Sequence, residues 1–525
     1  MDSTLHATQA WSLHLDLLLF FVKVPLAALL LVLLSTYTIL AKKRKWRCTE
    51  RLPPGPRPWP IIGNLLQTGS VPHVGMRKLT QKYGPLVYLK LGTVKAVVTD
   101  DPKFVMEFLK KQDHVFASRP KNIASEYFTY GGQDIAFSPY GAHWRTMRRL
   151  CLFELLTPKR IDFFKQGRLE EIKCMMKEVL AFSNNNQVIN LRDTFGALSS
   201  NTLTRMILGK RYFGPGDAGP GDAAEHKAII YAAFALINAF NVADYIPFLR
   251  PFDLHGHERK MRKLMMRVNE IYDAIVDEHR QRRKEAGLEE CHSNFVDQLL
   301  SLPGENGEEN LKQTTIKAIL IDMVAAGTDT SSITSEWTMA ELLKHPEMME
   351  NVRAEIDKVV GTGRLVEESD LSSLQQLKAT VKEIFRLHPV GAFLIPHISL
   401  QDTYVFGYYI PKDTRVLINT YALGRNPEVW DNPEEFRPQR FLRGDNVELS
   451  DGSLRIVPFG AGRRGCPGAT LGTSVVLLGL ARLIQAFDWS PFTQNTNLKE
   501  AHGLMVLEEP LKAFASPRLP SHLYS

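Results

Sequence analysis

The chain has 525 residues, five widely scattered cysteines and a formal net charge of +7. An odd number of cysteines, without CxxC or Cys/His spacing, argues against a disulfide framework and against a zinc site. The charge is modest, five of the cations lie together at residues 42–47, and no arginine-rich stripe is interleaved with aromatic residues. These features argue against nucleic-acid binding, whereas the length alone leaves the number of domains open.

The first predicted element is a membrane anchor. Residues 24–41 are uncharged and mostly Leu, Ala and Val, which is long enough to span a bilayer. The basic run KKRKWR at 42–47 follows at once, so the positive-inside rule places the rest of the chain in the cytosol. A cleaved signal peptide fits poorly, because strong positive charge stands where a small-residue cleavage site is needed. We therefore expect an anchor with its basic flank at 1–47.

A proline-rich segment follows the anchor. The run LPPGPRPWPIIGN excludes a helix and favours a stiff spacer, so a hinge is expected over 48–65. Short strands are predicted at 86–91 and 96–99, and helical patterns dominate from Pro102 onward. No shift in composition marks a further boundary, so residues 66–525 are expected to form one unit, mainly α with a small β region.

A basic helix is predicted around WRTMRR at residues 144–149. Trp144 and Arg148 are four residues apart and share one helical face, which puts an indole donor beside a guanidinium. Such a pair suits a carboxylate or a phosphate. Taken alone, the same residues also fit a surface helix with snorkelling side chains.

A long helix is predicted over residues 311–344, ended by His345 and Pro346. Its sequence AAGTDTS, at 325–331, interrupts an apolar face with a glycine, an acid and hydroxyls. Thr330 lies one turn after Ala326 and can bond to its carbonyl, and the glycine weakens the helix, so a local opening could admit water. A solvent-facing polar patch is the alternative interpretation.

Two segments further on carry charges that could meet. Glu383 and Arg386 are three residues apart on one predicted helix, and Arg440 lies in the proline-rich stretch PQRF. By itself the first pair is a commonplace surface ion pair of about 0.2–0.5 kcal/mol. Arg440 offers a third member that could brace the segment leading to the next motif.

The most informative motif is FGAGRRGCPG at 459–468. Two arginines precede Cys466 and an apolar helix opens just after it, and both features lower the pKa of a thiol. Cys466 is thus a candidate haem-iron ligand. The same run contains GxGxxG, but no βαβ unit follows it, so a dinucleotide site is disfavoured. A glycine-rich turn with an inert, buried cysteine is the remaining alternative.

In this order the motifs WxxxR, AGxDT, ExxR, PxRF and FxxGxRxCxG resemble those of the cytochrome P450 family, from the anchor to Ser525. The resemblance implies the cytochrome P450 fold, with heme b held by Cys466 as its thiolate ligand. It also implies that Thr330 with Asp329 organises water and delivers protons, and that Glu383, Arg386 and Arg440 are structural. The expected donors to the haem propionates are Trp144, Arg148, His397 and Arg464.

The resemblance also implies partners and a location. Electrons from NADPH would arrive through a membrane-bound flavoprotein reductase that docks on the cationic face near Cys466. O2 and a hydrophobic small molecule would be the substrates. The anchor would contact membrane lipid and hold the protein in the endoplasmic reticulum membrane as a single-pass protein, with its catalytic domain in the cytosol.

By analogy with the family, the pocket is lined by residues 125–136, 233–243, 321–330, 390–395 and 502–506. Residues 389–397, 415–420 and 517–524 are similar to those of plant fatty-acid hydroxylases of pollen- and spore-wall (sporopollenin) biosynthesis, which implies in-chain hydroxylation of a medium-chain acid such as lauric acid. The alternatives are hydroxylation of a flavonoid or other phenolic, a reductase-independent haem-thiolate isomerase or dehydratase, and a non-enzymatic haem-binding membrane protein.

Overall fold

The structure is a computed structural model. It describes residues 50–213, 225, 228–229, 232–233, 235–237, 239–286, 294–304, 310–442, 452–493, 498–501 and 505–524. The expected membrane anchor at 1–47 lies outside the described residues, and the expected hinge is described from Glu50 onward. The boundaries of the three expected segments therefore stay predictions.

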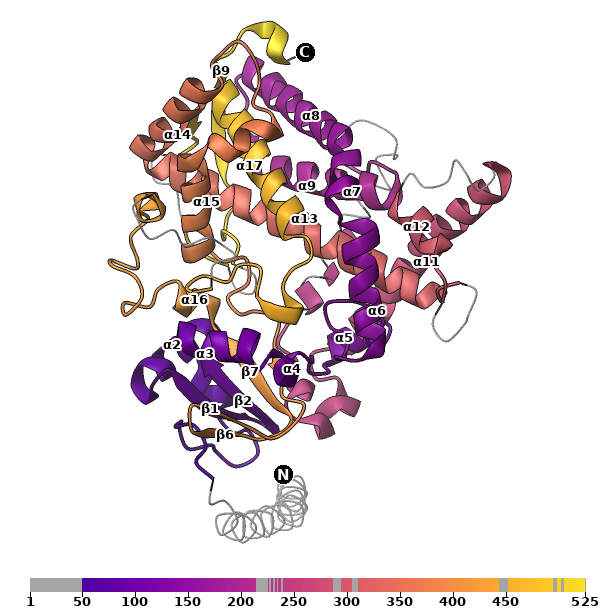
Figure 1. Ribbon diagram of the computed structural model, residues 1–525, viewed down its shortest axis with the longest axis vertical. Helices are drawn as coiled ribbons and strands as arrows, with labels where there is room; N and C mark the ends of the chain where they lie inside the picture. Colours follow the sequence, from indigo (N-terminus) through magenta and orange to yellow (C-terminus); the bar gives the residue numbers. More distant parts are fainter. Residues whose placement is uncertain are drawn as a thin grey trace, which may run out of the picture.

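A four-stranded sheet forms one end of the molecule (Figure 1). Strands β1 (Leu86–Leu91) and β2 (Val94–Thr99) form an antiparallel hairpin, as predicted, and Gly92 makes its turn at a φ of 59°. The sheet is completed by β7 (Thr414–Ile418), parallel to β2, and β4 (His397–Ile398), antiparallel to β7. The hairpin β1–β2 thus lies in one sheet with β7 and β4, which follow it by about 300 residues in the sequence.

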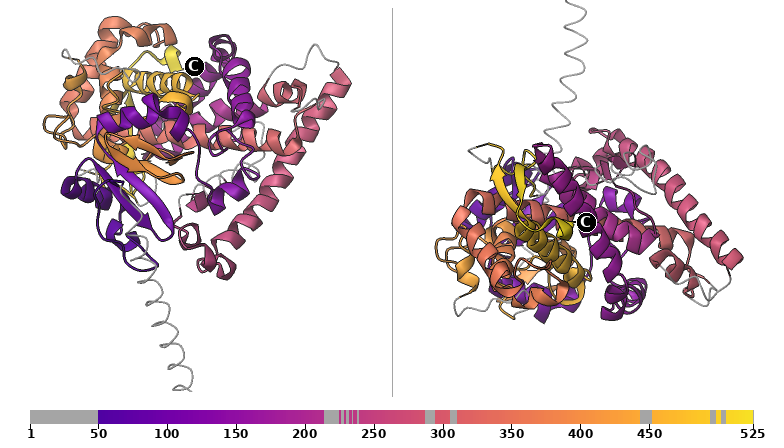
Figure 2. Two further views of the ribbon diagram at one scale, coloured as in Figure 1. Left: turned by 60° about the horizontal axis from the view of Figure 1, so that its bottom comes forward. Right: turned by 90° about the horizontal axis from the view of Figure 1, so that it is seen from above.

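The rest is mainly helical, as predicted. The α-helices other than the central ones are α2 (Pro72–Tyr83), α3 (Pro102–Met106), α4 (Asp113–Phe116), α5 (Ile123–Phe128), α6 (Ala142–Leu150), α7 (Pro158–Phe163), α8 (Lys165–Asn184), α11 (His257–Ala286), α12 (Phe295–Ser301), α14 (Pro346–Val359) and α16 (Thr420–Leu423). Figure 2 shows α11 along one flank of the molecule.

Shorter helices and strands complete the chain. They are η1 (Leu65–Thr68), η2 (Glu107–Lys111), η3 (Cys151–Leu155), η4 (Val242–Asp244), η5 (Pro247–Phe252), η7 (Glu368–Ser373), η8 (Pro438–Phe441), η9 (Gly462–Arg464), η10 (Ser521–Tyr524), β3 (Ile189–Asn190), β5 (Thr403–Val405), β6 (Tyr408–Ile410), β8 (Phe487–Pro491) and β9 (Lys512–Pro517).

Four long helices build the core. Helix α13 (Gln313–Lys344) crosses the molecule and packs on α9 (Leu191–Leu208), α15 (Gln375–Leu387) and α17 (Ala469–Ala486) (Figure 1). The last half of α13 is buried almost without interruption, because its apolar residues are not confined to one face. The predicted end of this helix, before His345 and Pro346, is confirmed.

Helix α17 begins just after Cys466, close to its predicted start. Among the described residues it is the one helix long and apolar enough to cross a membrane, yet most of it is buried inside the protein. A helix that is apolar all round and surrounded by other helices is a core helix. It therefore fixes the Cys466 loop to the centre of the fold.

Candidate active site around Cys466

The loop that carries Cys466 is held by backbone contacts. The amide N–H of Cys466 donates to the carbonyl of Phe459 at 2.7 Å. Gly462 has a φ of 64°, and a Cβ there would lie 1.8 Å from the carbonyl oxygen of Leu109 in η2. Only glycine lets the loop lie this close to η2. An added Cβ at Gly468 would lie 4.0 Å from the Cys466 sulfur.

Cys466 is exposed as a residue, although protein atoms surround its thiol closely enough to desolvate it. Burial raises the pKa of its thiol, while the Gly468 amide and the Arg148 guanidinium lower it, and the net direction is upward. The expectation of a lowered thiol pKa is therefore wrong for the free protein, because desolvation outweighs the nearby charge. A metal ion deprotonates a thiol that coordinates it, so this thiol can still serve as a ligand.

Trp144 and Arg148 lie on α6 and point toward the Cys466 loop and the segment before α6. Arg148 donates through Nη2 to the carbonyl of Gly465, next to Cys466. The buried Trp144 donates through Nε1 to the carbonyl of Ile135 at 3.1 Å. The predicted common face is thus confirmed, and its donors bind backbone carbonyls.

Arg464 points into the protein rather than toward the sulfur. Its guanidinium lies over the Trp144 ring at 4.3 Å. It donates to three backbone carbonyls, those of Ala117, Ile135 and Ser138. Burial lowers its pKa to about 10, with Arg148 adding repulsion against the attraction of Asp134.

A second buried arginine joins this cluster. Arg119 donates to the carbonyls of Ala136, Ile395 and Pro396. Burial and the charge of Arg464 lower its pKa to about 9. The sequence analysis did not select Arg119. An arginine two residues after the apolar run VFA, at residues 115–117, was the available signal, because a cation in a buried segment needs a partner.

His397 completes the cluster from β4. Its Nδ1 lies 2.9 Å from the carbonyl of Phe116 and must carry the proton, since a carbonyl only accepts. Burial, and then the charges of Arg119 and Arg464, lower its pKa well below the ordinary value. The ring is neutral and its Nε2 is an acceptor, so His397 would donate to an anion only if that anion raised its pKa.

These observations test whether the residues suit a haem group. Arg119 and Arg464 are mostly buried, and within the described part of the chain their hydrogen bonds go to backbone carbonyls rather than to carboxylates. Two carboxylates beside them would relieve the mutual repulsion that lowers the pKa of Arg119. A thiol ligand on one side and unneutralised cations nearby fit a haem with its two propionates.

Thr330 and Asp329 lie in the middle of helix α13. Thr330 Oγ1 donates to the carbonyl of Ala326 at 2.7 Å, as predicted. Thr330 and Ala326 are exposed, although α13 crosses the core. Asp329 is buried, and burial raises its pKa to about 6. The motif is therefore divided, because Asp329 faces the interior whereas Thr330 is exposed.

Helix α13 is continuous through this region, so the predicted local opening is absent. Gly327 serves close packing instead. A Cβ there would lie 2.3 Å from Cδ1 of Leu203 in α9, so glycine lets the two helices approach. Solvent contacts this part of α13 at the exposed positions Ala326 and Thr330.

The predicted charged triad forms. Glu383 and Arg386 are fully buried and paired at 2.7 Å, and Arg440 reaches the same carboxylate at 3.1 Å. The amide of Arg437 also donates to Glu383. A surface ion pair is excluded, and the triad joins α15 to η8, in the stretch that leads to the Cys466 loop. Gln439 of η8 donates through Nε2 to the sulfur of Met348 in α14 at 2.8 Å, which ties η8 to a second helix.

The pocket segments named in the sequence analysis are partly described. The amide of Leu394 donates to the carbonyl of Ile418 at 3.2 Å, and that of Met505 to the carbonyl of Val390 at 3.1 Å. These bonds tie residues 390–395 to β7 and to the chain end. Residues 502–504 and several positions of 233–243 lie outside the described part.

The family model for Cytochrome P450 matches residues 53–514. Cytochrome P450 703A2 of Arabidopsis thaliana is 46% identical over 511 residues, 95% of this chain and 100% of that protein. A flavonoid 3'-monooxygenase of Petunia hybrida is 39% identical, with 90% of this chain and 93% of that one covered. A zebra fish cytochrome P450 structure with progesterone has a TM-score of 0.71 at 28% identity, covering 86% of this chain and 100% of that one.

A mainly helical fold that presents a thiol beside buried cations, matched along its length by these proteins, defines a haem-thiolate monooxygenase. The chain belongs to the cytochrome P450 family. It is an NADPH- and O2-dependent oxidoreductase that binds haem, receives its electrons from a redox partner and acts on a hydrophobic substrate.

Proposed function

We propose that this enzyme hydroxylates a medium-chain fatty acid, such as lauric acid, within its alkyl chain. Cys466 binds the haem iron. The haem propionates accept hydrogen bonds from Trp144, Arg148, His397, Arg464 and Arg119. The observation that carries this assignment is the group of buried arginines that donate only to backbone carbonyls beside the Cys466 loop. Bound haem supplies the centre at which O2 is activated.

The chain's own groups supply positioning and protons. The raised pKa of Asp329 keeps part of this carboxyl protonated near neutral pH, so it can give a proton to water beside Thr330. Thr330 Oγ1, already donating to Ala326, accepts from such a water. Burial of Thr328 and Val324 around them limits the water that enters.

Substrate choice rests on the pocket segments. Phe393 and Leu394 are half-buried, and Val506 packs against the core, so together they offer an apolar wall to an alkyl chain. The similarity of residues 389–397, 415–420 and 517–524 to plant fatty-acid hydroxylases supports an acid over a flavonoid. Sporopollenin formation is the corresponding biological role.

We also propose that the protein is anchored in the endoplasmic reticulum membrane by 1–47, with a hinge at 48–65 and a catalytic domain at 66–525. A flavoprotein reductase that takes its electrons from NADPH docks on cations around the Cys466 loop. Lys110 and Lys111 of η2 and Arg145 and Arg149 of α6 are exposed there, and η2 packs on η9. The anchor's basic flank contacts anionic lipid.

The proposed function is tested with purified full-length protein, reductase and NADPH. The reduced, CO-bound protein should show the Soret band of thiolate-ligated haem, and Cys466→Ser should lose that band. Laurate should give in-chain hydroxylated products only when the reductase is present. Turnover of flavonoids but not of C10–C16 acids would overturn the substrate, and reductase-independent consumption of fatty-acid hydroperoxide would overturn the reaction.

A further inference from the structure

Two aromatic rings stack at the far end of α13, away from the Cys466 loop. Trp337 is fully buried, and its ring lies 3.7 Å from the ring of His388, centroid to centroid, at an angle of 6°. His388 follows α15 directly and is itself buried. Helices α13 and α15 pack on each other (Figure 1), so this stack joins the two helices.

Trp337 also holds the chain end. Its Nε1 donates to the carbonyl of Met505 at 2.7 Å, and the amide of Met505 donates to the carbonyl of Val390 at 3.1 Å. Glu336, which directly precedes Trp337 on α13, accepts a hydrogen bond from the amide of Leu511 at 2.9 Å. Helix α13 thus holds the segment around Met505 by hydrogen bonds, and Met505 in turn is bonded to Val390, at the start of residues 390–395.

His388 is fixed from the other side. Its Nε2 lies 2.8 Å from Glu341 of α13. Although burial opposes ionisation, hydrogen bonds from His345 and His388 lower the pKa of Glu341 to about 2. Glu341 is therefore a carboxylate that only accepts, and the Nε2 of His388 must donate to it. Pro389 and Val390 follow at once, so the position of the His388 ring sets where the pocket segment begins.

We propose that Trp337 and His388 form a positioning unit that fixes residues 390–395 and 505–506 relative to α13, and thereby selects which carbon of the substrate is oxidised. Neither side chain touches the reacting atoms. This inference rests on the proposed function for the location of the pocket and for an alkyl substrate. A shift of these two segments would slide the alkyl chain past the oxidising centre, because no directional contact holds an alkyl chain in register.

Trp337→Phe is the primary variant, since phenylalanine keeps an aromatic ring but loses the donor to Met505. His388→Gln keeps a donor to Glu341 and loses the stack. Trp489→Phe is the matched control, because the indole of Trp489, in strand β8, also donates to a backbone carbonyl, that of Leu483 at 3.0 Å, and not to the Met505 segment. Each full-length variant is measured for its reduced, CO-bound spectrum, for KM, kcat and positional isomers with laurate, and for spectral affinity for 1-dodecylimidazole.

We expect Trp337→Phe and His388→Gln to keep the wild-type spectrum and a kcat within about twofold, to change the isomer ratio and to raise KM, each by roughly tenfold at most. Trp489→Phe should match wild type in all four measurements. Wild-type isomer ratios in both variants, or an equal change in Trp489→Phe, would overturn the proposal. If Trp337→Phe does not bind haem, His388→Gln and His388→Phe decide in the same way.

The imidazole probe separates this inference from the proposed function. It binds haem iron with its ring and places a twelve-carbon chain in the pocket, whatever the natural substrate is. If wild type does not oxidise laurate, the substrate proposal fails. The positioning unit is then supported only if Trp337→Phe and His388→Gln weaken dodecylimidazole binding while Trp489→Phe does not, and it is overturned if all three bind alike.

Discussion

Burial, rather than neighbouring charge, sets the ionisation of the residues at this site. It raises the pKa of Asp329 to about 6 and that of the Cys466 thiol, and it lowers the pKa of Arg119 to about 9. Each shift disfavours the charged form. For Asp329 the shift brings the pKa of the carboxyl close to neutral pH, which is where a proton donor is most effective.

Asp329→Asn tests this at one residue. The folded-state pKa of Asp329 is raised from 3.8 to about 6, so the wild type loses stability as pH rises through this window. The variant should gain about 1–3 kcal/mol over wild type at pH 8 and nothing at pH 3.5. Thermal unfolding at several pH values measures this, and equal stability differences throughout would contradict it.

The same variant should turn over substrate about 10²-fold more slowly, because a carboxamide cannot give up a proton. The dependence of kcat on pH should lose its inflection near pH 6. Substrate affinity should not change, since Asp329 is buried in α13. A loss of activity with the inflection retained would assign the proton to another group.

At the scale of elements, the segment between α5 and α6 is clamped between charges of opposite sign. Asp322 of α13 accepts from the amides of Ile135 and Ala136 at 3.2 and 3.1 Å. The carbonyls of the same two residues accept from Arg464 and Arg119 at 3.0 Å each. One short segment thus links the central helix to the proposed propionate donors.

Asp322→Ala should release this segment. Two buried amides lose their acceptor, at about 1–3 kcal/mol each. Hydrogen exchange at Ile135 and Ala136 should accelerate by roughly 5- to 150-fold, and haem should be lost faster on dilution. Asp322→Asn keeps an acceptor oxygen, so its exchange rates and its rate of haem loss should lie between those of wild type and Asp322→Ala. Unchanged exchange in Asp322→Ala would show that the amides are held by other means.

The buried triad makes a second prediction at this scale. Glu383→Gln leaves Arg386 and Arg440 without their buried counter-charge, which should cost about 3–5 kcal/mol. Glu270→Gln is the control, because Glu270 is 63% exposed and pairs with Arg267 at the surface. That change should cost at most about 1 kcal/mol. Thermal unfolding and haem content compare the two variants, and equal losses would contradict the buried role.

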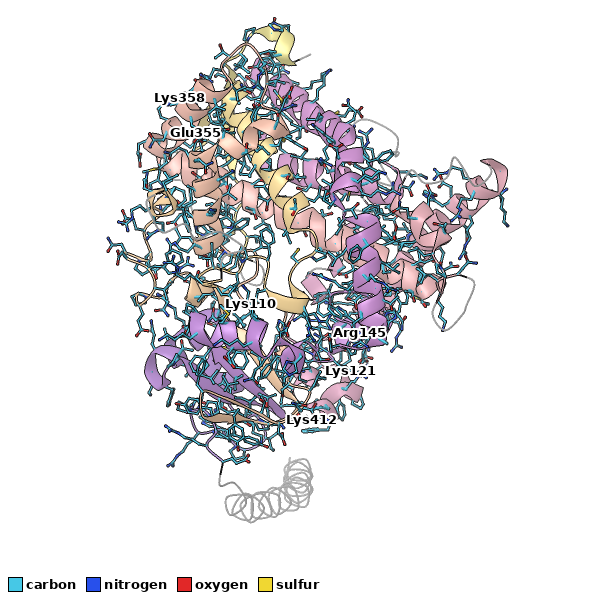
Figure 3. The ribbon with its side chains drawn as sticks, in the orientation of Figure 1. Lys110, Lys121, Arg145, Glu355, Lys358 and Lys412 are labelled. Atoms are coloured by element: carbon cyan, nitrogen blue, oxygen red, sulfur yellow. The ribbon has the colours of Figure 1, made fainter. Side chains whose placement is uncertain are left out.

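At the scale of the whole molecule, the proposed reductase face can be tested by charge reversal. Lys110→Glu and Arg145→Glu should slow reduction by the reductase, and the effect should shrink as salt is added. Lys358→Glu is the matched control, since Lys358 is also exposed but lies at the other end of the molecule (Figure 3). Stopped-flow reduction kinetics report this step directly. Equal slowing by Lys358→Glu would mean that net charge, not this face, matters.

Local patterns predicted much of this molecule. The bounds of α13, the start of α17 and the Glu383, Arg386 and Arg440 triad follow from helical periodicity and motif order. Arg119 was missed because two of its acceptors, the carbonyls of Ile395 and Pro396, are 276 and 277 residues away. The predicted direction of the shift in the Cys466 pKa was wrong, because desolvation is a property of the packed chain and not of the local sequence. The segment boundaries and the membrane anchor stay predictions.

Helix α17 has a consequence for how the chain is made. Its sequence is long and apolar enough to be taken for a membrane span, but its place is between buried helices. It is also the last α-helix of the described chain, so α13, α14 and α15 are synthesised before it emerges. Because chains fold from the N-terminus as they are made, its partners are ready to receive it. Late placement thus shortens the time during which the membrane-insertion machinery could capture it.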